Sequence, residues 1–93
     1  MKKGTTKTGF NFYVNPTDLQ DMCVLDYLAD VLDPESPEIR KIISMSKLTE
    51  KVLGADQKRT LYNHIAEKHD GKVPPAALEA ELTEILSGDE TKN

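Results

Sequence analysis

The sequence has no tryptophan, a single cysteine and few aromatic residues, which make up 5% of its 93 positions. One cysteine cannot form a disulfide within the chain, so a disulfide-stapled secreted scaffold is excluded. No apolar run approaches the roughly 20 residues that cross a bilayer as a helix. Met1-Lys2-Lys3 is followed by Gly4 and Thr5 rather than by an apolar stretch. We therefore expect no signal peptide, no membrane partner and an intracellular, soluble protein.

Hydrophobic residues make up 38% of the chain, and its length suits one small domain. A small core leaves a thin stability margin, to which a bound partner would add. We expect a single helical interaction domain over residues 1–88 and a polar tail over residues 89–93.

Charge is distributed unevenly along the chain, whose net charge is −4. Residues 1–14 carry three lysines and no acid, and residues 39–72 carry eight basic residues against four acids. Residues 15–38 carry seven acids and no base, and residues 73–93 carry five acids and one lysine. Three interpretations of this pattern are open: the segments face each other in the fold, they steer a charged partner, or they simply alternate on a solvated surface. The negative total argues against nucleic acid, because phosphate neutralisation needs a basic surface.

The N-terminal region predicts a short β-hairpin or strand. Phe10, Phe12 and Val14 alternate with polar residues at the period-two spacing of a half-buried strand. Gly9 suggests a tight turn, with residues 2–7 as the partner strand. Because an isolated hairpin is marginal in water, we expect its phenylalanine face to pack on helices.

Start and stop signals then predict three to five helices, so the expected fold is mainly α (α+β). Asn15 and Pro16 are typical of an N-cap and a first helical position. Gly54 suits a left-handed C-terminal cap, and Ser44-Met45-Ser46 weakens the middle of the second helix, which is then one helix or two shorter ones. The expected helices span about residues 16–32, 38–53, 56–69 and 76–86.

The first predicted helix is apolar over an unusually wide arc. At 100° per residue its apolar side chains cover roughly 220°, about twice what a surface helix needs. We expect cover on two sides, from the hairpin or from another chain, unless the whole arc is ordinary core. Val24, Tyr27 and Val31 are expected on the outer side of the arc, opposite Met22 and Ala29. The candidate partner-binding residues are Met22, Val24, Tyr27, Leu28 and Val31.

No residue pattern indicates catalysis, a metal site or a cofactor. His64 and His69 are five apart and point about 140° away from each other on a helix, so they cannot share a metal ion. His69 is expected on the apolar face at the helix end, where the dipole favours a histidine. Cys23 lies near Asp26 and Asp30, an acidic setting unsuited to a thiolate nucleophile. We expect a protein that is not an enzyme, with no catalytic residue, metal or cofactor.

A role in DNA binding is an alternative that rests on two basic residues. Lys58 and Arg59 open the third predicted helix, as they would in a recognition helix. Lys58 nevertheless falls on or near the apolar stripe with Leu61 and Ile65, and basic residues are not interleaved with aromatic ones.

Short segments follow one another in a distinctive order along nearly the whole chain. They are Gly9-Phe10-Asn11-Phe12-Tyr13-Val14, Asp21-Met22, Leu53-Gly54, Gln57-Lys58, Leu61-Tyr62-Asn63-His64-Ile65, Asp70-Gly71-Lys72-Val73-Pro74 and Leu82-Thr83-Glu84-Ile85. This series resembles the small tail assembly chaperones encoded by long-tailed phages and prophages of Gram-positive bacteria.

The resemblance implies a non-enzymatic role with two protein partners. Such chaperones bind the long helical tape measure protein, keep it soluble and help tail tube subunits polymerise around it. They act in the host cytoplasm and leave before the virion is complete. A helical client needs an apolar groove that accepts anchors at helical spacing. The alternatives are a small DNA-binding regulator and an oligomeric scaffold whose apolar arc is buried by self-association.

Overall fold

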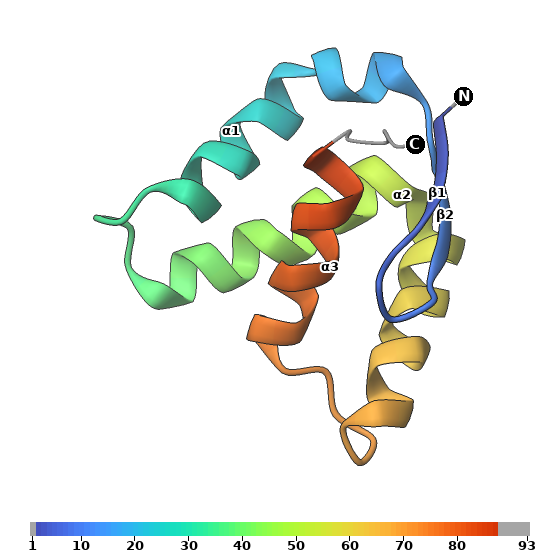
Figure 1. The fold of residues 1–93 in the computed structure, drawn as a ribbon. Helices are drawn as coiled ribbons and strands as arrows, with labels where there is room; N and C mark the ends of the chain where they lie inside the picture. Colours follow the sequence, from blue (N-terminus) through green and yellow to red (C-terminus); the bar gives the residue numbers. More distant parts are fainter. Residues whose placement is uncertain (1, 88–93) are drawn as a thin grey trace.

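The computed structural model of the chain describes residues 2–87, so the predicted tail at 89–93 lies outside the described residues. Its elements are β1 (Lys2–Thr5), β2 (Asn11–Val14), the 3-10 helix η1 (Pro16–Gln20), α1 (Met22–Leu32), α2 (Glu38–Lys68) and α3 (Pro75–Ser87). The prediction of a mainly α fold with an N-terminal β-hairpin is confirmed (Figure 1). No helix among the described residues has the length and apolarity needed to cross a membrane.

The hairpin pairs β1 and β2 antiparallel, with Gly4 opposite Phe12. At its tip, Gly9 adopts a φ of 99° and donates its N–H to the carbonyl of Thr6 over 2.9 Å. A Cβ atom on Gly4 would lie 2.7 Å from the Phe12 ring, so the ring covers this position only because glycine stands there. Phe10, Phe12 and Val14 are buried, as the period-two pattern predicts.

The prediction of one continuous helix over residues 16–32 is wrong. The segment forms η1, then an extended residue, Asp21, and then α1. Asn15 caps η1 by accepting the N–H of Thr17, and Asp21 caps α1 by accepting the N–H of Cys23 over 2.8 Å. An aspartate in extended conformation is a strong N-cap, so Asp21 starts a new helix instead of continuing the first.

The second and third predicted helices form one element, α2, that bends at Gly54. This glycine has φ 82° and ψ 164°, so its φ is positive as the predicted left-handed cap requires, but its ψ lies outside the left-handed helical region. The backbone leaves the helical conformation here, so two helical segments meet at a kink, as the sequence predicts, without a loop between them. A break at Ser44-Met45-Ser46 is not seen, because Ser44 and Met45 are buried within the helix. The Ser44 hydroxyl donates to Asp30 of α1 over 2.8 Å, which gives this polar residue a partner.

Helix α3 follows a turn in which Asp70 and Gly71 both have positive φ. It crosses the antiparallel pair made by α1 and the first half of α2, while the hairpin lies beside the second half of α2 (Figure 1). Its predicted stripe of Leu78, Leu82 and Ile85 is buried, as expected. The buried apolar core consists of Phe10, Phe12, Val14, Val24, Met45, Leu48, Val52, Leu53, Leu61, Ile65, Leu78, Leu82 and Ile85.

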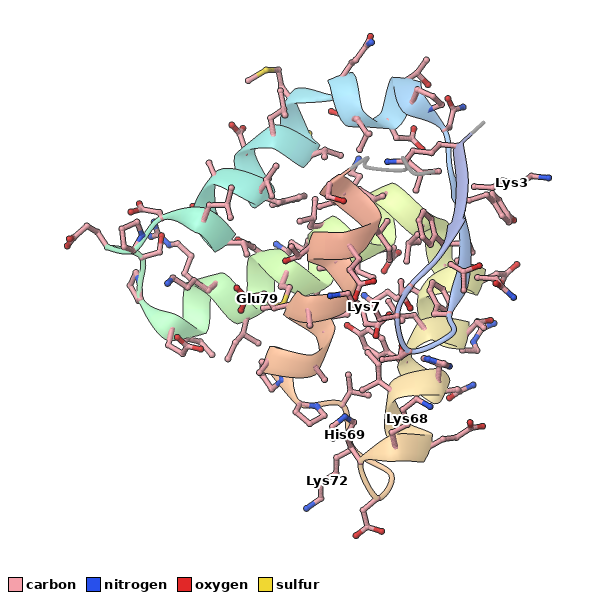
Figure 2. All side chains as sticks on the ribbon, viewed as in Figure 1. Lys3, Lys7, Lys68, His69, Lys72 and Glu79 are labelled. Carbon is pink, nitrogen blue, oxygen red and sulfur yellow. The ribbon has the colours of Figure 1, made fainter. Side chains whose placement is uncertain are left out.

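The two histidines lie at different places on the second half of α2. His64 is partly buried, and its ring centroid is 5.9 Å from that of Phe10. His69 is the C-cap residue of α2, so its expected place at the helix end is confirmed. Its expected place on the apolar face is wrong, because His69 is exposed beside the turn to α3 (Figure 2).

Candidate partner-binding surface

Helix α1 exposes several of its large apolar side chains. Met22 is 64% exposed, Leu25 is 42% and Leu32 is 69%, and Ala29 between them is also exposed. These four residues, which we call the α1 strip, follow a spacing of three, four and three positions. That spacing places them within roughly 80° of one another on a helix. They therefore form one apolar line along the outer side of α1.

The candidate residues divide between this strip, the core and partly buried positions beside the core. Met22 is exposed, whereas Val24 is 2% exposed and belongs to the core. Tyr27, Leu28 and Val31 are partly buried and pack against the core. The expectation that Val24, Tyr27 and Val31 form the outer side of the arc is therefore wrong. The structure turns that side inward and leaves the opposite side exposed.

Burial of Val24 and one hydrogen bond to α2 accompany this rotation of α1. Asp30 accepts the hydroxyl of Ser44 on α2, so the side of α1 that carries Asp30 faces α2. Tyr27 lies on the same side, with the Lys47 ammonium 6.0 Å from its ring centroid. Asp30 and Tyr27 are thus directed towards α2, whereas Asp26 is exposed and the other half of the apolar arc faces away from α2. Sequence periodicity gives the width of an arc but does not tell which half is covered.

A groove adjoins the α1 strip on the side of α3. It has a volume of about 250 Å³ and its lining is mainly apolar. Its apolar lining residues are Leu28, Val31, Leu32, Leu48, Leu82 and Leu86. Leu32 belongs to both the strip and this groove, which we call the α1–α3 groove. The two features therefore form one continuous apolar surface.

Acidic residues border this surface on both edges. On the helical wheel, Asp26 lies roughly 40° beyond Met22 of the strip. Asp33 is the extended C-cap residue that follows Leu32 at the end of the strip, and its carboxylate accepts the N–H of Glu35 over 2.8 Å. Glu79 of α3 lines the far rim of the groove. Within residues 2–87, the ion pairs join Lys58 to Glu50 and Arg59 to Asp56, so none of the acids between 15 and 38 is paired. The surface is apolar in the middle and negative at its margins.

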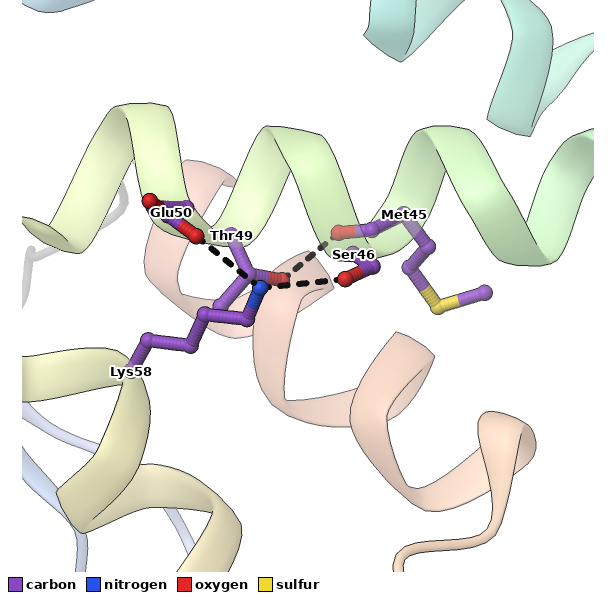
Figure 3. A network of polar contacts seen from close by, with 5 residues as sticks. All are labelled: Met45, Ser46, Thr49, Glu50 and Lys58. Atoms are coloured by element: carbon purple, nitrogen blue, oxygen red, sulfur yellow. Dashed lines mark hydrogen bonds and ion pairs between the residues drawn. The ribbon is translucent and has the colours of Figure 1, made fainter. Parts of the chain in front are cut away.

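Lys58, the residue on which the DNA-binding alternative depends, is engaged within the protein. Its ammonium contacts Ser46 at 3.0 Å and Glu50 at 3.3 Å (Figure 3). The same ammonium lies 5.5 Å from the centroid of the Tyr62 ring. Its side chain is only 18% exposed. Lys58 therefore links the two halves of α2 across the bend at Gly54 and does not reach outward.

A second polar cluster joins the hairpin tip to α2 and α3. Thr8 donates its hydroxyl to Glu81 over 2.6 Å, and the hydroxyl oxygen lies 2.9 Å from Nε2 of His64. Because the single hydroxyl proton goes to Glu81, the histidine must donate to Thr8. A nucleophilic hydroxyl requires the opposite arrangement, in which the histidine accepts its proton. This cluster fastens the hairpin and does not activate Thr8.

This cluster is not predicted by the sequence analysis, although the position of Glu81 indicates that its carboxylate needs a partner. Glu81 lies next to Leu82 and one turn from Leu78 and Ile85, within the apolar stripe of α3. It is 4% exposed, and its Oε1 has no hydrogen-bond partner among the described residues. A carboxylate on a buried stripe calls for a partner from another element. That partner, Thr8, lies 73 residues away, so the sequence does not reveal it.

No family model matches this chain, and comparisons with curated proteins and with solved structures gave no match.

Proposed function

We propose that this chain is a tail assembly chaperone of a phage or prophage. In this role it binds the tape measure protein, assists tail tube assembly in the host cytoplasm and catalyses no reaction. Two things support the proposal: the order of segments that resembles this family, and a surface suited to an apolar client. The observation that carries it is the exposed α1 strip beside the α1–α3 groove.

The small apolar area of the α1 strip limits how tightly the strip alone can bind a client. Burying a large apolar side chain completely contributes about 1.5–3 kcal/mol. Met22, Leu25 and Leu32 are roughly half exposed, so together they supply about 3–5 kcal/mol. Association itself costs about 4–15 kcal/mol. The strip alone is therefore insufficient, and a stable complex requires the client to fill the groove as well.

Co-purification with the tape measure protein encoded beside this chain tests the proposal. The informative variant is Leu25→Asp/Leu32→Asp, which places two charges in the strip. The matched control is Ile39→Asp/Ile43→Asp, because these α2 residues are also exposed, at 65% and 49%, but lie outside the strip and groove. We expect the tape measure protein to be retained by the wild type and the control, and to be lost from the strip variant.

Circular dichroism of the three proteins shows whether each remains helical. Failure of the wild type to retain the tape measure protein at low salt would contradict the chaperone role. Undiminished retention by a folded strip variant would contradict the assignment of the surface.

A further inference from the structure

We propose that the α1 strip and the α1–α3 groove receive one amphipathic helix whose apolar stripe is flanked by lysines or arginines. This inference rests on the proposed function and specifies the chemistry of the partner at the same surface. It follows from the spacing of the apolar residues and from the charges at their margins.

The spacing indicates a helical occupant. The α1 strip advances by three, four and three residues, which is the repeat by which two helices pack at a small crossing angle. From Met22 to Leu32 the strip extends about 15 Å at 1.5 Å per residue. A helix of about three turns covers that length. Its side chains would enter the groove beside Leu32, whose lining includes Leu82 and Leu86 of α3.

The charges indicate a basic occupant. Asp26 and Asp33 border the strip and Glu79 borders the groove, so a helix seated here has carboxylates along both of its sides. Residues 15–38 contain no basic residue, and the Lys47 ammonium, 6.0 Å from the Tyr27 ring centroid, lies on the side of α1 that faces α2. Figure 2 shows Lys3 and Lys7 on the hairpin, Lys68 at the end of α2 and Lys72 in the turn to α3, all away from α1.

The same charges disfavour a second copy of this chain. A symmetric contact through the α1 strip brings the exposed Asp26 of each copy to the same interface, within an acidic segment that carries no base in either copy. Like charges brought together across an interface oppose association. A partner with basic flanks gains from the same field, which speeds the encounter and fixes the orientation of the bound helix.

Two designed peptides test the inference directly. They share one leucine stripe at heptad spacing and one fluorescent label, and their flanking positions carry only lysine or only glutamate. Anisotropy titrations use the full chain at about 0.02 M and 0.3 M salt. We expect the lysine peptide to bind at least about tenfold more tightly at low salt, and this preference to shrink to about threefold at high salt.

Charge-reversed variants identify the carboxylates that cause the preference for the lysine peptide. Asp26→Lys and Glu79→Lys are each expected to reduce the preference for the lysine peptide by about threefold or more. The control is Glu67→Lys, which changes the net charge equally at an exposed position near the end of α2. Its preference should change far less. Leu25→Asp/Leu32→Asp should abolish binding of both peptides.

Four results would overturn the inference: binding of neither peptide, equal binding of both, full binding by the strip variant, or an equal effect of Glu67→Lys. Concentration-dependent light scattering that the strip variant abolishes would also overturn it, because a second copy would then occupy the surface. The proposed function can fail separately. Tight binding of the lysine peptide without any retention of the tape measure protein would contradict the chaperone role alone.

Discussion

Helix α1 and the β-hairpin are both rich in apolar residues, but they use them differently. In the hairpin region Phe10, Phe12 and Val14 are all buried. Eight of the eleven residues of α1 are aliphatic, aromatic or methionine, yet Val24 alone is buried. The fold therefore needs nearly every apolar side chain of the hairpin and few of those of α1. The excess on α1 has no role in the core, which is why we assign it to a partner.

The two regions also treat polar groups differently. The hairpin tip gives its hydroxyls and amides internal partners: Thr8 donates to Glu81, and the N–H of Lys7 donates to Glu84 over 2.8 Å. The edge of β2 is closed by Gln57, whose side-chain amide exchanges two hydrogen bonds with the backbone of Tyr13. On α1, Asp26 is exposed and makes no ion pair with any residue between 2 and 87. The polar groups of the hairpin thus find partners within the protein, whereas the carboxylate of Asp26 on α1 stays exposed to solvent.

The largest expected change in the free energy of unfolding comes from comparing a core leucine with a leucine of the α1 strip, each replaced by alanine. Leu61 is fully buried, so Leu61→Ala should lower the free energy of unfolding by about 2–5 kcal/mol. Leu32→Ala, on the α1 strip, should change it by less than about 0.5 kcal/mol. Urea unfolding followed by circular dichroism gives both values. A similar loss in the two variants would mean that the strip belongs to the core.

The cluster at the hairpin tip supplies the next largest effect. Thr8→Val removes the hydrogen bond to Glu81 and leaves this buried side chain without a partner, which should cost about 1–3 kcal/mol. Thr5→Val is the control, because its hydroxyl bonds the exposed Asn11 side chain and its loss should cost less than about 0.5 kcal/mol. The measurement is again the free energy of unfolding in urea.

A double variant separates loss of a bond from loss of packing. In Thr8→Val/Glu81→Leu neither partner remains, so the double variant should lose less stability than the sum of the single variants. Additive losses would show that Thr8 and Glu81 act independently, which would contradict the claim that this cluster fastens the hairpin.

Elements set by local patterns could be predicted from the sequence. The alternation of Phe10, Phe12 and Val14 gave the buried strand, and the stripe of Leu78, Leu82 and Ile85 gave α3. Each pattern is complete within a few residues and needs no knowledge of the rest of the chain. The positive φ at Gly54 was predictable for the same reason.

Features that depend on distant contacts could not be predicted. The rotation of α1 depends on contacts with α2 and the core, such as the hydrogen bond between Asp30 and Ser44, which lie 14 positions apart on different helices. Of the five candidate residues, Val24 and Tyr27 lie on the inward side, Leu28 and Val31 line the α1–α3 groove, and Met22 alone belongs to the α1 strip. Both Asn15 and Asp21 are residue types that cap helices, and they lie six positions apart. Helical periodicity alone did not reveal that each of them starts its own helix.

The smallest predicted effect has the opposite sign to the others. Asp26 and Asp30 are four residues apart on α1, and like charges at this spacing destabilise a helix by about 0.2–0.5 kcal/mol. Asp26→Asn should therefore stabilise the protein slightly, raising Tm by about 1–3 °C at low salt, and the gain should decrease as salt screens the repulsion. Asp56→Asn is the control, because Asp56 pairs with Arg59 at 3.3 Å and its removal should bring no gain. Differential scanning calorimetry measures both. If Asp26→Asn raises Tm yet weakens binding of the lysine-flanked peptide, the acidic margin of α1 acts against folding and in favour of a partner. A fall in Tm would instead make Asp26 part of the fold.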